Sequence, residues 1–274
     1  MKFSICNETY VDWPFARVCD DVAASGFDGI EIAPFTLAED PSSLDEAAAA
    51  EVGLVAQRAG LTVVGLHWLL LAPPGLHLTS PDEEVRACTV SFLEKMSRLC
   101  AAMGGHVMVL GSPQQRRISQ GQSYEDAFRH ASDACRKVAE TAGPLGVTLA
   151  LEPLAPSIAN FLSSAAETAR LIEAVDHPAC ALHLDVSAMS SEASSIEDVI
   201  LAHGEGLAHF HANDPNQGGP GTGEVDYVPI VSALRRVKYD RWVSVEIFDH
   251  TCDGPTIARQ SMAYLKRVFA GGDA

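Results

Sequence analysis

The chain has 274 residues, and its 36 acidic against 19 basic side chains give it a formal net charge of −17. A surface this acidic repels phosphate backbones and anionic membranes, which disfavours nucleic acid and membranes as partners. No apolar run approaches the roughly 20 residues that span a bilayer, and the amino terminus predicts a first strand rather than a signal peptide. The seven cysteines are scattered without a C-x-x-C pair, which is typical of reduced thiols in a cytoplasmic protein.

Short apolar runs alternate with longer amphipathic runs along the whole chain. The short runs predict eight strands, at residues 2–6, 29–33, 61–67, 106–111, 147–152, 180–185, 207–212 and 242–247. The longer runs predict eight helices, at residues 14–25, 44–59, 82–103, 123–142, 164–175, 195–204, 227–237 and 255–269. Eight strand–helix units fit an α/β fold of one domain, a single (β/α)8 TIM barrel over residues 1–274. A doubly wound open sheet is the alternative, but no glycine-rich dinucleotide fingerprint follows any strand.

The last four predicted strands each end in a polar side chain, in the order Glu152, Asp185, His211 and Glu246. Barrel enzymes carry their catalytic groups at the carboxyl ends of the strands, and neighbouring strands lie only about 4.8 Å apart. Three carboxylates that converge there repel one another, and a divalent cation relieves the repulsion. Three carboxylate oxygens and one imidazole suit one fairly hard ion, Mn²⁺ first, with Mg²⁺ or Co²⁺ as alternatives. The competing interpretation is that the four are salt-bridged core residues or helix N-caps.

Three further histidines lie on the inward parity of their strands. His183 precedes Asp185 by two positions and His209 precedes His211 by two, so each points to the barrel axis one layer deeper. We expect both to hydrogen-bond in the core or to support a ligand from behind. His67 closes the third strand, where it either contacts a substrate or bonds a neighbouring carbonyl.

Four more residues near the same end of the barrel are candidates. Trp13 and Trp68 follow the first and third strands, where they either wall a small hydrophilic ligand or only pack. Arg116 follows the fourth strand and either pairs with a polar substrate or lies in a solvated loop. Glu31 ends the second strand, and we expect it to be structural.

The stretches "LALEP", "LHLDVSAM", "HFHAND" followed by "GTGEVDY", and "WVSVEIFD" resemble the sugar isomerase/epimerase superfamily, which is built on a xylose-isomerase-like barrel. That superfamily includes ketose 3-epimerases, hydroxypyruvate isomerase, inosose isomerases and dehydratases, 3-dehydroshikimate dehydratase and the endonuclease IV branch. The resemblance spans the chain, and it implies that Glu152, Asp185, His211 and Glu246 bind the metal. It also implies a homodimer or homotetramer.

This chain departs from the resembling families at their substrate contacts. Ketose 3-epimerases place a Glu, a His and an Arg where this chain has Ile158, Ala188 and Gln217. The metal chemistry therefore carries over, whereas those substrate contacts do not. The extra zinc ligands of the endonuclease IV branch are also missing, which disfavours phosphoester hydrolysis.

These residues together predict a metal-dependent isomerase or epimerase for a keto-sugar or related polyol. Glu152 and Glu246 would remove and return a proton next to a carbonyl, through an enediolate that the metal stabilises. Loss of a β-leaving group at the same site would instead give a lyase or dehydratase for a keto-sugar, 3-keto-glycoside or inosose. A metal-dependent phosphoester hydrolase and a non-enzymatic sugar-binding module are the remaining alternatives.

Overall fold

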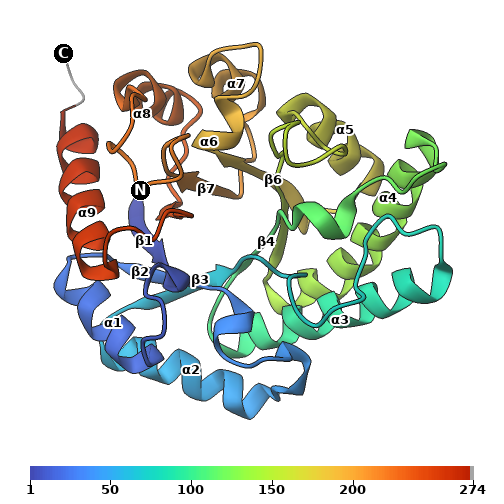
Figure 1. Ribbon diagram of the computed structural model, residues 1–274, viewed down its shortest axis with the longest axis horizontal. Coiled ribbons are helices and arrows are strands. Elements are labelled where there is room, and N and C mark those ends of the chain that lie inside the picture. The colour runs from blue at the N-terminus through green and yellow to red at the C-terminus, as the bar shows by residue number, and fades with distance from the viewer. Residues whose placement is uncertain (272–274) are drawn as a thin grey trace.

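Eight parallel strands close into a barrel in chain order, and the helices form a ring outside them (Figure 1). This computed structural model describes residues 1–271. The strands are β1 (Lys2–Cys6), β2 (Gly29–Ile32), β3 (Thr62–Leu66), β4 (Val107–Leu110), β5 (Thr148–Leu151), β6 (Cys180–Asp185), β7 (His209–Ala212) and β8 (Trp242–Val245). Each strand pairs in parallel with the next, and β8 pairs with β1 to close the barrel. The predicted TIM barrel is confirmed, and the open sheet is excluded.

The longer helices follow the strands as the sequence predicts. They are α1 (Phe15–Ala24), α2 (Glu46–Arg58), α3 (Glu83–Ala102), α4 (Tyr124–Ala142), α5 (Ala165–Val175), α7 (Ile196–His203), α8 (Tyr227–Arg236) and α9 (Gly254–Ala270). All but α1 begin at a Ser or Asp whose side chain accepts an N–H of the first turn, namely Asp45, Asp82, Ser123, Ser164, Ser195, Asp226 and Asp253.

The sequence did not predict the shortest elements. These are α6 (Val186–Met189) and the 3-10 turns at Asn7–Thr9, Pro34–Thr36, Pro41–Ser43, Pro113–Arg116 and Gly143–Leu145. Several of them lie at the carboxyl ends of the strands, where they shape the loops around the site. One domain over residues 1–274 stays our proposal, and residues 272–274 lie outside the described part of the chain.

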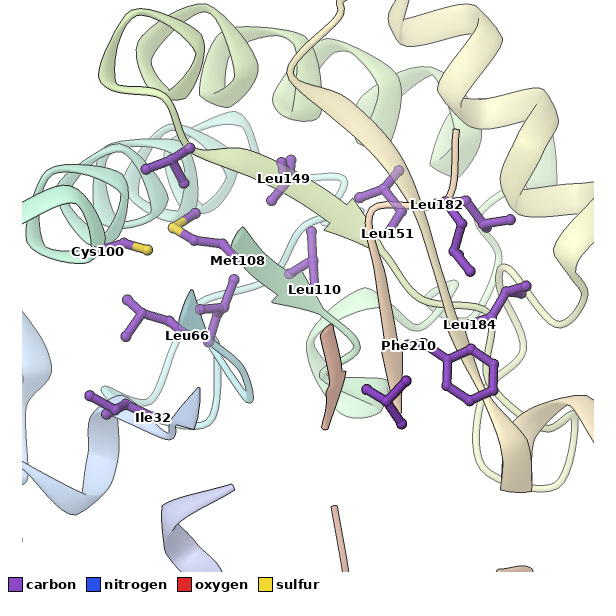
Figure 2. Packing of buried hydrophobic residues seen from close by; sticks show 14 of the residues in the cluster. Ile32, Leu66, Cys100, Met108, Leu110, Leu149, Leu151, Leu182, Leu184 and Phe210 are labelled. Atoms are coloured by element: carbon purple, nitrogen blue, oxygen red, sulfur yellow. The ribbon is translucent and has the colours of Figure 1, made fainter. Parts of the chain in front are cut away.

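Alternation along the strands separates an apolar outer face from an inner face that carries the polar groups near the carboxyl ends and a small apolar cluster that includes Val109, Ala150 and Trp242. Outward side chains pack between the strands and the helices, and Figure 2 shows part of this layer with Met108, Leu110, Leu149, Leu151, Leu182, Leu184 and Phe210. Burial of each such side chain stabilises the fold by about 1.5–3 kcal/mol. Because this layer stabilises the barrel from outside, the upper interior can carry polar groups.

Two composition-based expectations can be compared with the described residues. Within residues 1–271, no helix is long and apolar enough to cross a membrane. All seven cysteines are free thiols.

Candidate metal centre and active site

Glu152, Asp185, His211 and Glu246 meet at the carboxyl ends of β5 to β8. One ligand atom from each lies within 4.8 Å of the others, and all four residues are buried. Asp185 ends β6 and His211 lies in β7, where the strand register places the two residues opposite each other. Glu152 and Glu246 directly follow β5 and β8. Three carboxylates and one imidazole in so small a volume are a donor set that a divalent cation prefers.

The electrostatics of these four side chains also fit a cation. Burial, together with the negative charges of Glu246 and Asp185, raises the pKa of Glu152 well above its usual range. Burial and Glu246 likewise raise the pKa of Asp185 to about 6. Burial acts on Glu246 in the same direction, but the charge of His211 and its hydrogen bond lower the pKa of Glu246. The charge of His211 lowers the pKa of all three carboxylates, but it outweighs the opposing effects only at Glu246. A divalent ion would offset the remainder.

Glycine at position 111 makes room for the Glu152 carboxylate. A Cβ atom at Gly111, just after β4, would lie 2.0 Å from Oε2 of Glu152. Any other residue at position 111 would therefore push that carboxylate aside.

The Asp185 carboxylate is held by two hydrogen bonds. Its Oδ2 accepts from Nδ2 of Asn213 at 2.6 Å, and its Oδ1 accepts from the backbone N–H of Ala188 at 2.7 Å. Asn213 in turn accepts the backbone N–H of Ser187 through Oδ1. The network ties α6 and the end of β7 to this carboxylate.

Glu31 is the carboxylate that orients the histidines. It is fully buried, and its side chain accepts from Nε2 of His209 at 2.8 Å and from Nε2 of His211 at 3.2 Å. Burial favours the neutral acid, but the charges of His209 and His211 hold the pKa of Glu31 well below its usual range. Because an ionised carboxylate only accepts, both Nε2 atoms carry a hydrogen. The Nδ1 atom of His211 then faces Glu246, 3.0 Å away, an arrangement common for metal-binding histidines.

His183 and His209 lie below the four converging residues. The register pairs them with each other two residues before Asp185 and His211, and their rings stack at 5.5 Å between centroids. His183 is fully buried, and burial together with the charges of His211 and His209 holds its pKa well below its usual range. His183 therefore stays neutral beside the centre, with Nε2 3.9 Å from Oε1 of Glu152.

A cavity of about 530 Å³ opens over the carboxyl ends of β1, β2, β3 and β8. The structure places Trp13 and Trp68 on its wall, together with Phe35 and Phe248. Trp68 stacks on Phe248 with 5.8 Å between ring centroids and lies 5.9 Å from Phe35. Its φ of 51° is a strained conformation for a tryptophan, of a kind that clusters at functional sites. This part of the cavity therefore offers flat apolar surfaces to a ligand.

His67 is not on the wall of this cavity, and among residues 1–271 it makes no hydrogen bond to a backbone carbonyl, which was one of its two expected roles. It is fully buried, with Nε2 2.9 Å from Oε1 of Glu8 and Nδ1 3.8 Å from Oε1 of Glu31. Burial disfavours its charge, but Glu8, Glu31 and Glu246 raise the pKa of His67 to about 9. His67 thus stands behind Glu8, which itself lines the cavity.

Arg116 is buried, so the solvated-loop alternative is wrong, and it is not on the wall of this cavity. The residue is 1% exposed, and its Nη1 donates to the backbone carbonyl of Glu152 at 2.5 Å. Burial lowers the pKa of Arg116 to about 10, so it stays charged near neutral pH. Its guanidinium therefore holds the end of β5 in place.

Comparisons with known proteins agree with this geometry. A family model described as a xylose isomerase-like TIM barrel matches residues 19–268. The chain belongs to this family. It is 28% identical over 247 residues to a probable ketose 3-epimerase of Synechocystis sp., covering 89% of this chain and 79% of that protein. It is 27% identical over 260 residues to the D-psicose 3-epimerase of Agrobacterium fabrum, covering 94% and 86%.

The fold of this xylose isomerase-like barrel is shared with solved structures. A D-psicose 3-epimerase crystallised in the presence of D-fructose superposes with a TM-score of 0.86 at 23% identity, over 99% of this chain and 100% of the other. The predicted resemblance to the sugar isomerase/epimerase superfamily is confirmed.

Sequence reasoning missed Glu8 and underrated Glu31. Glu8 lies in the 3-10 turn directly after β1, and Glu31 lies in β2, so both belong to the strand ends that carry the site. Four other strands of the predicted barrel end in polar groups. An acidic residue at the end of β1 or β2 was therefore a signal that the sequence offered.

Proposed function

We propose that this xylose isomerase-like barrel is a divalent-metal-dependent sugar epimerase or isomerase that acts on a keto-sugar. The observation that carries the proposal is the convergence of Glu152, Asp185, His211 and Glu246 at one buried point beside an aromatic-walled cavity. The ketose and D-psicose 3-epimerases among its relatives support the same reaction class.

The four converging residues would hold one ion, with Mn²⁺ as the first candidate and Mg²⁺ or Co²⁺ as alternatives. When bound, the ion would supply Lewis-acid chemistry that polarises a substrate carbonyl and stabilises the charge that develops beside it. Asp185, fixed by Asn213, and His211, fixed by Glu31, would keep the donor set in place.

Glu152 and Glu246 are the proposed proton carriers. They follow β5 and β8, with β6 and β7 between them, so they approach the site from separate strands. One carboxylate removes the proton from the carbon next to the carbonyl, and the other returns a proton to the opposite face. Return to the same carbon inverts its configuration, whereas return to the neighbouring carbon isomerises the sugar.

A lyase that acts on a keto-glycoside or inosose is the second candidate. Ile158, Ala188 and Gln217 stand where ketose 3-epimerases bind their substrates, so a modified keto-sugar fits this chain as well as a free ketose. Expulsion of a β-leaving group after proton removal would need no change in the metal centre. The substrate is a small carbohydrate in either case, and a cytoplasmic dimer or tetramer stays a prediction.

Exchange of substrate hydrogen with solvent tests the proposal. The Mn²⁺-loaded protein is incubated in D₂O with D-psicose, D-fructose, D-tagatose, L-ribulose and a 3-keto-glucoside, and deuterium is located by NMR. We expect deuterium next to the carbonyl of at least one sugar, and an unsaturated product would indicate the lyase. Glu152→Gln should lose about 10²–10⁴-fold in rate, while the exposed Glu140→Gln serves as the matched control. Full exchange in the presence of a chelator, or in Glu152→Gln, would contradict the proposal.

A further inference from the structure

His183 is a buried imidazole that the rest of the described chain does not hydrogen-bond. Its side chain is 0% exposed, and within residues 1–271 neither Nδ1 nor Nε2 has a hydrogen-bond partner. Oε1 of Glu152 lies 3.9 Å from Nε2, which is beyond the range of a hydrogen bond. Because an unpaired polar group in the core costs free energy, this imidazole is suited to a partner that is not part of the chain.

The ring of His183 lies against the four converging residues of the metal centre. The ligand atoms of His183, Glu152 and His211 all lie within 4.8 Å of one another. The rings of His183 and His211 meet edge to face, with 4.3 Å between their centroids. Two of the four proposed metal ligands are therefore also the closest polar surroundings that the structure gives this imidazole.

The chemical state of His183 suits a metal ion. A metal binds the neutral form of histidine, because the ligating nitrogen must carry a lone pair. Burial and the charges of His211 and His209 favour that form, since they hold the pKa of His183 well below its usual range. A water molecule between His183 and Glu152 is the other partner that would satisfy the ring, and spectra that depend on metal coordination distinguish the two.

From this geometry we infer that His183 supplies a second nitrogen donor to the ion held by the four converging residues. Imidazole suits the later transition metals, whereas Mg²⁺ prefers oxygen ligands. His183 is thereby a specificity-determining residue for the metal, and it favours Co²⁺ over Mg²⁺. This inference rests on the proposed metal-dependent function and narrows the class of ion that the centre takes.

Proton NMR of the Co²⁺-loaded protein tests this inference directly, because Co²⁺ shifts the protons of a coordinated imidazole far outside their ordinary range. We expect two strongly shifted N–H signals, one from His211 and one from His183, that are absent from a sample prepared in D₂O. His183→Leu should keep one of them. The control is His106→Leu, the same substitution at an exposed histidine directly before β4, and it should keep both.

Calorimetric titrations with Co²⁺ and with Mg²⁺ measure the preference between the two ions. His183→Leu should lower the ratio of Co²⁺ affinity to Mg²⁺ affinity by about 10–100-fold. The metal-free variant should melt no lower than the metal-free wild type, because leucine replaces an unpaired imidazole without loss of a hydrogen bond. A merely structural histidine would give the opposite pattern, with a lower melting temperature and an unchanged affinity ratio, and that pattern would overturn the inference.

The outcomes also separate this inference from the proposed function. A single shifted N–H signal in the wild type would overturn the inference and leave the epimerase proposal intact. If His183→Leu fails to fold, the wild-type spectrum alone decides, with two signals in support and one against. Two shifted signals without deuterium exchange into any sugar would overturn the epimerase proposal alone. A wild-type protein that binds neither ion would count against both.

Discussion

Adding one methyl group at Gly111 should disable the metal centre without unfolding the barrel. In Gly111→Ala the new Cβ would lie 2.0 Å from Oε2 of Glu152, against the 3.4 Å at which ordinary contacts begin. The carboxylate end of Glu152 is flexible and can rotate away, whereas the backbone at position 111 has no positive φ to forbid alanine. The clash should therefore be relieved by moving the carboxylate by about 1 Å or more.

A displacement of this size at a catalytic group costs about 10²-fold in rate. We expect turnover of the best substrate to fall by about that factor and Mn²⁺ to bind more weakly, while the melting temperature changes by only a few degrees. Turnover, calorimetric Mn²⁺ titration and thermal unfolding measure the three quantities. Gly271→Ala, at the end of α9, is the control, since its Cβ would meet only ordinary contact distances. Wild-type turnover and Mn²⁺ affinity in Gly111→Ala would refute the placement of Glu152 at the centre.

Three other perturbations test the surroundings of the site. Glu31→Gln should lower the free energy of unfolding by about 3 kcal/mol near pH 7, because His209 and His211 lose their ionised acceptor. Since the pKa of Glu31 is depressed below its usual 4.5 in the folded protein, this stabilisation is present above that pH and fades as pH falls through the folded value. Urea unfolding at several pH values measures the difference in unfolding free energy between wild type and Glu31→Gln. A difference that grows as the pH falls would contradict this prediction. Arg116→Lys, which loses the planar donor to the Glu152 carbonyl, should turn over about ten-fold more slowly with manganese retained, and unchanged steady-state rates would count against this role. Chelation of divalent ions should lower the melting temperature. Adding Mn²⁺ at 100 times its dissociation constant should raise the free energy of unfolding by about 2.7 kcal/mol. Identical melting curves with and without Mn²⁺ would contradict this prediction.

The strands and helices could be predicted because their signals are local. Short apolar runs and longer amphipathic runs placed every strand and long helix within two residues of its observed bounds. Alternation along the strands brought Glu152, Asp185, His211 and Glu246 to one end of the barrel, because side-chain parity and parallel register are properties of neighbouring residues.

The roles of the other candidates depend on contacts between residues far apart in the sequence. Glu31 and His209 are 178 positions apart, so no local pattern shows that one orients the other. The parity of His67 places it inside the barrel, but only the turn after β1 shows that Glu8 separates it from the cavity. Arg116 lies shortly after Pro113, which predicts a loop. Only tertiary packing shows that its guanidinium turns inward and bonds the carbonyl of Glu152.

Anomalous X-ray diffraction at the manganese absorption edge, from crystals grown with Mn²⁺, tests the central claim most directly. The account predicts one anomalous peak per chain, bound by Glu152, Asp185, His211 and Glu246. A peak held instead by Glu8 and His67, or crystals saturated with Mn²⁺ that show no peak among the four residues, would contradict it.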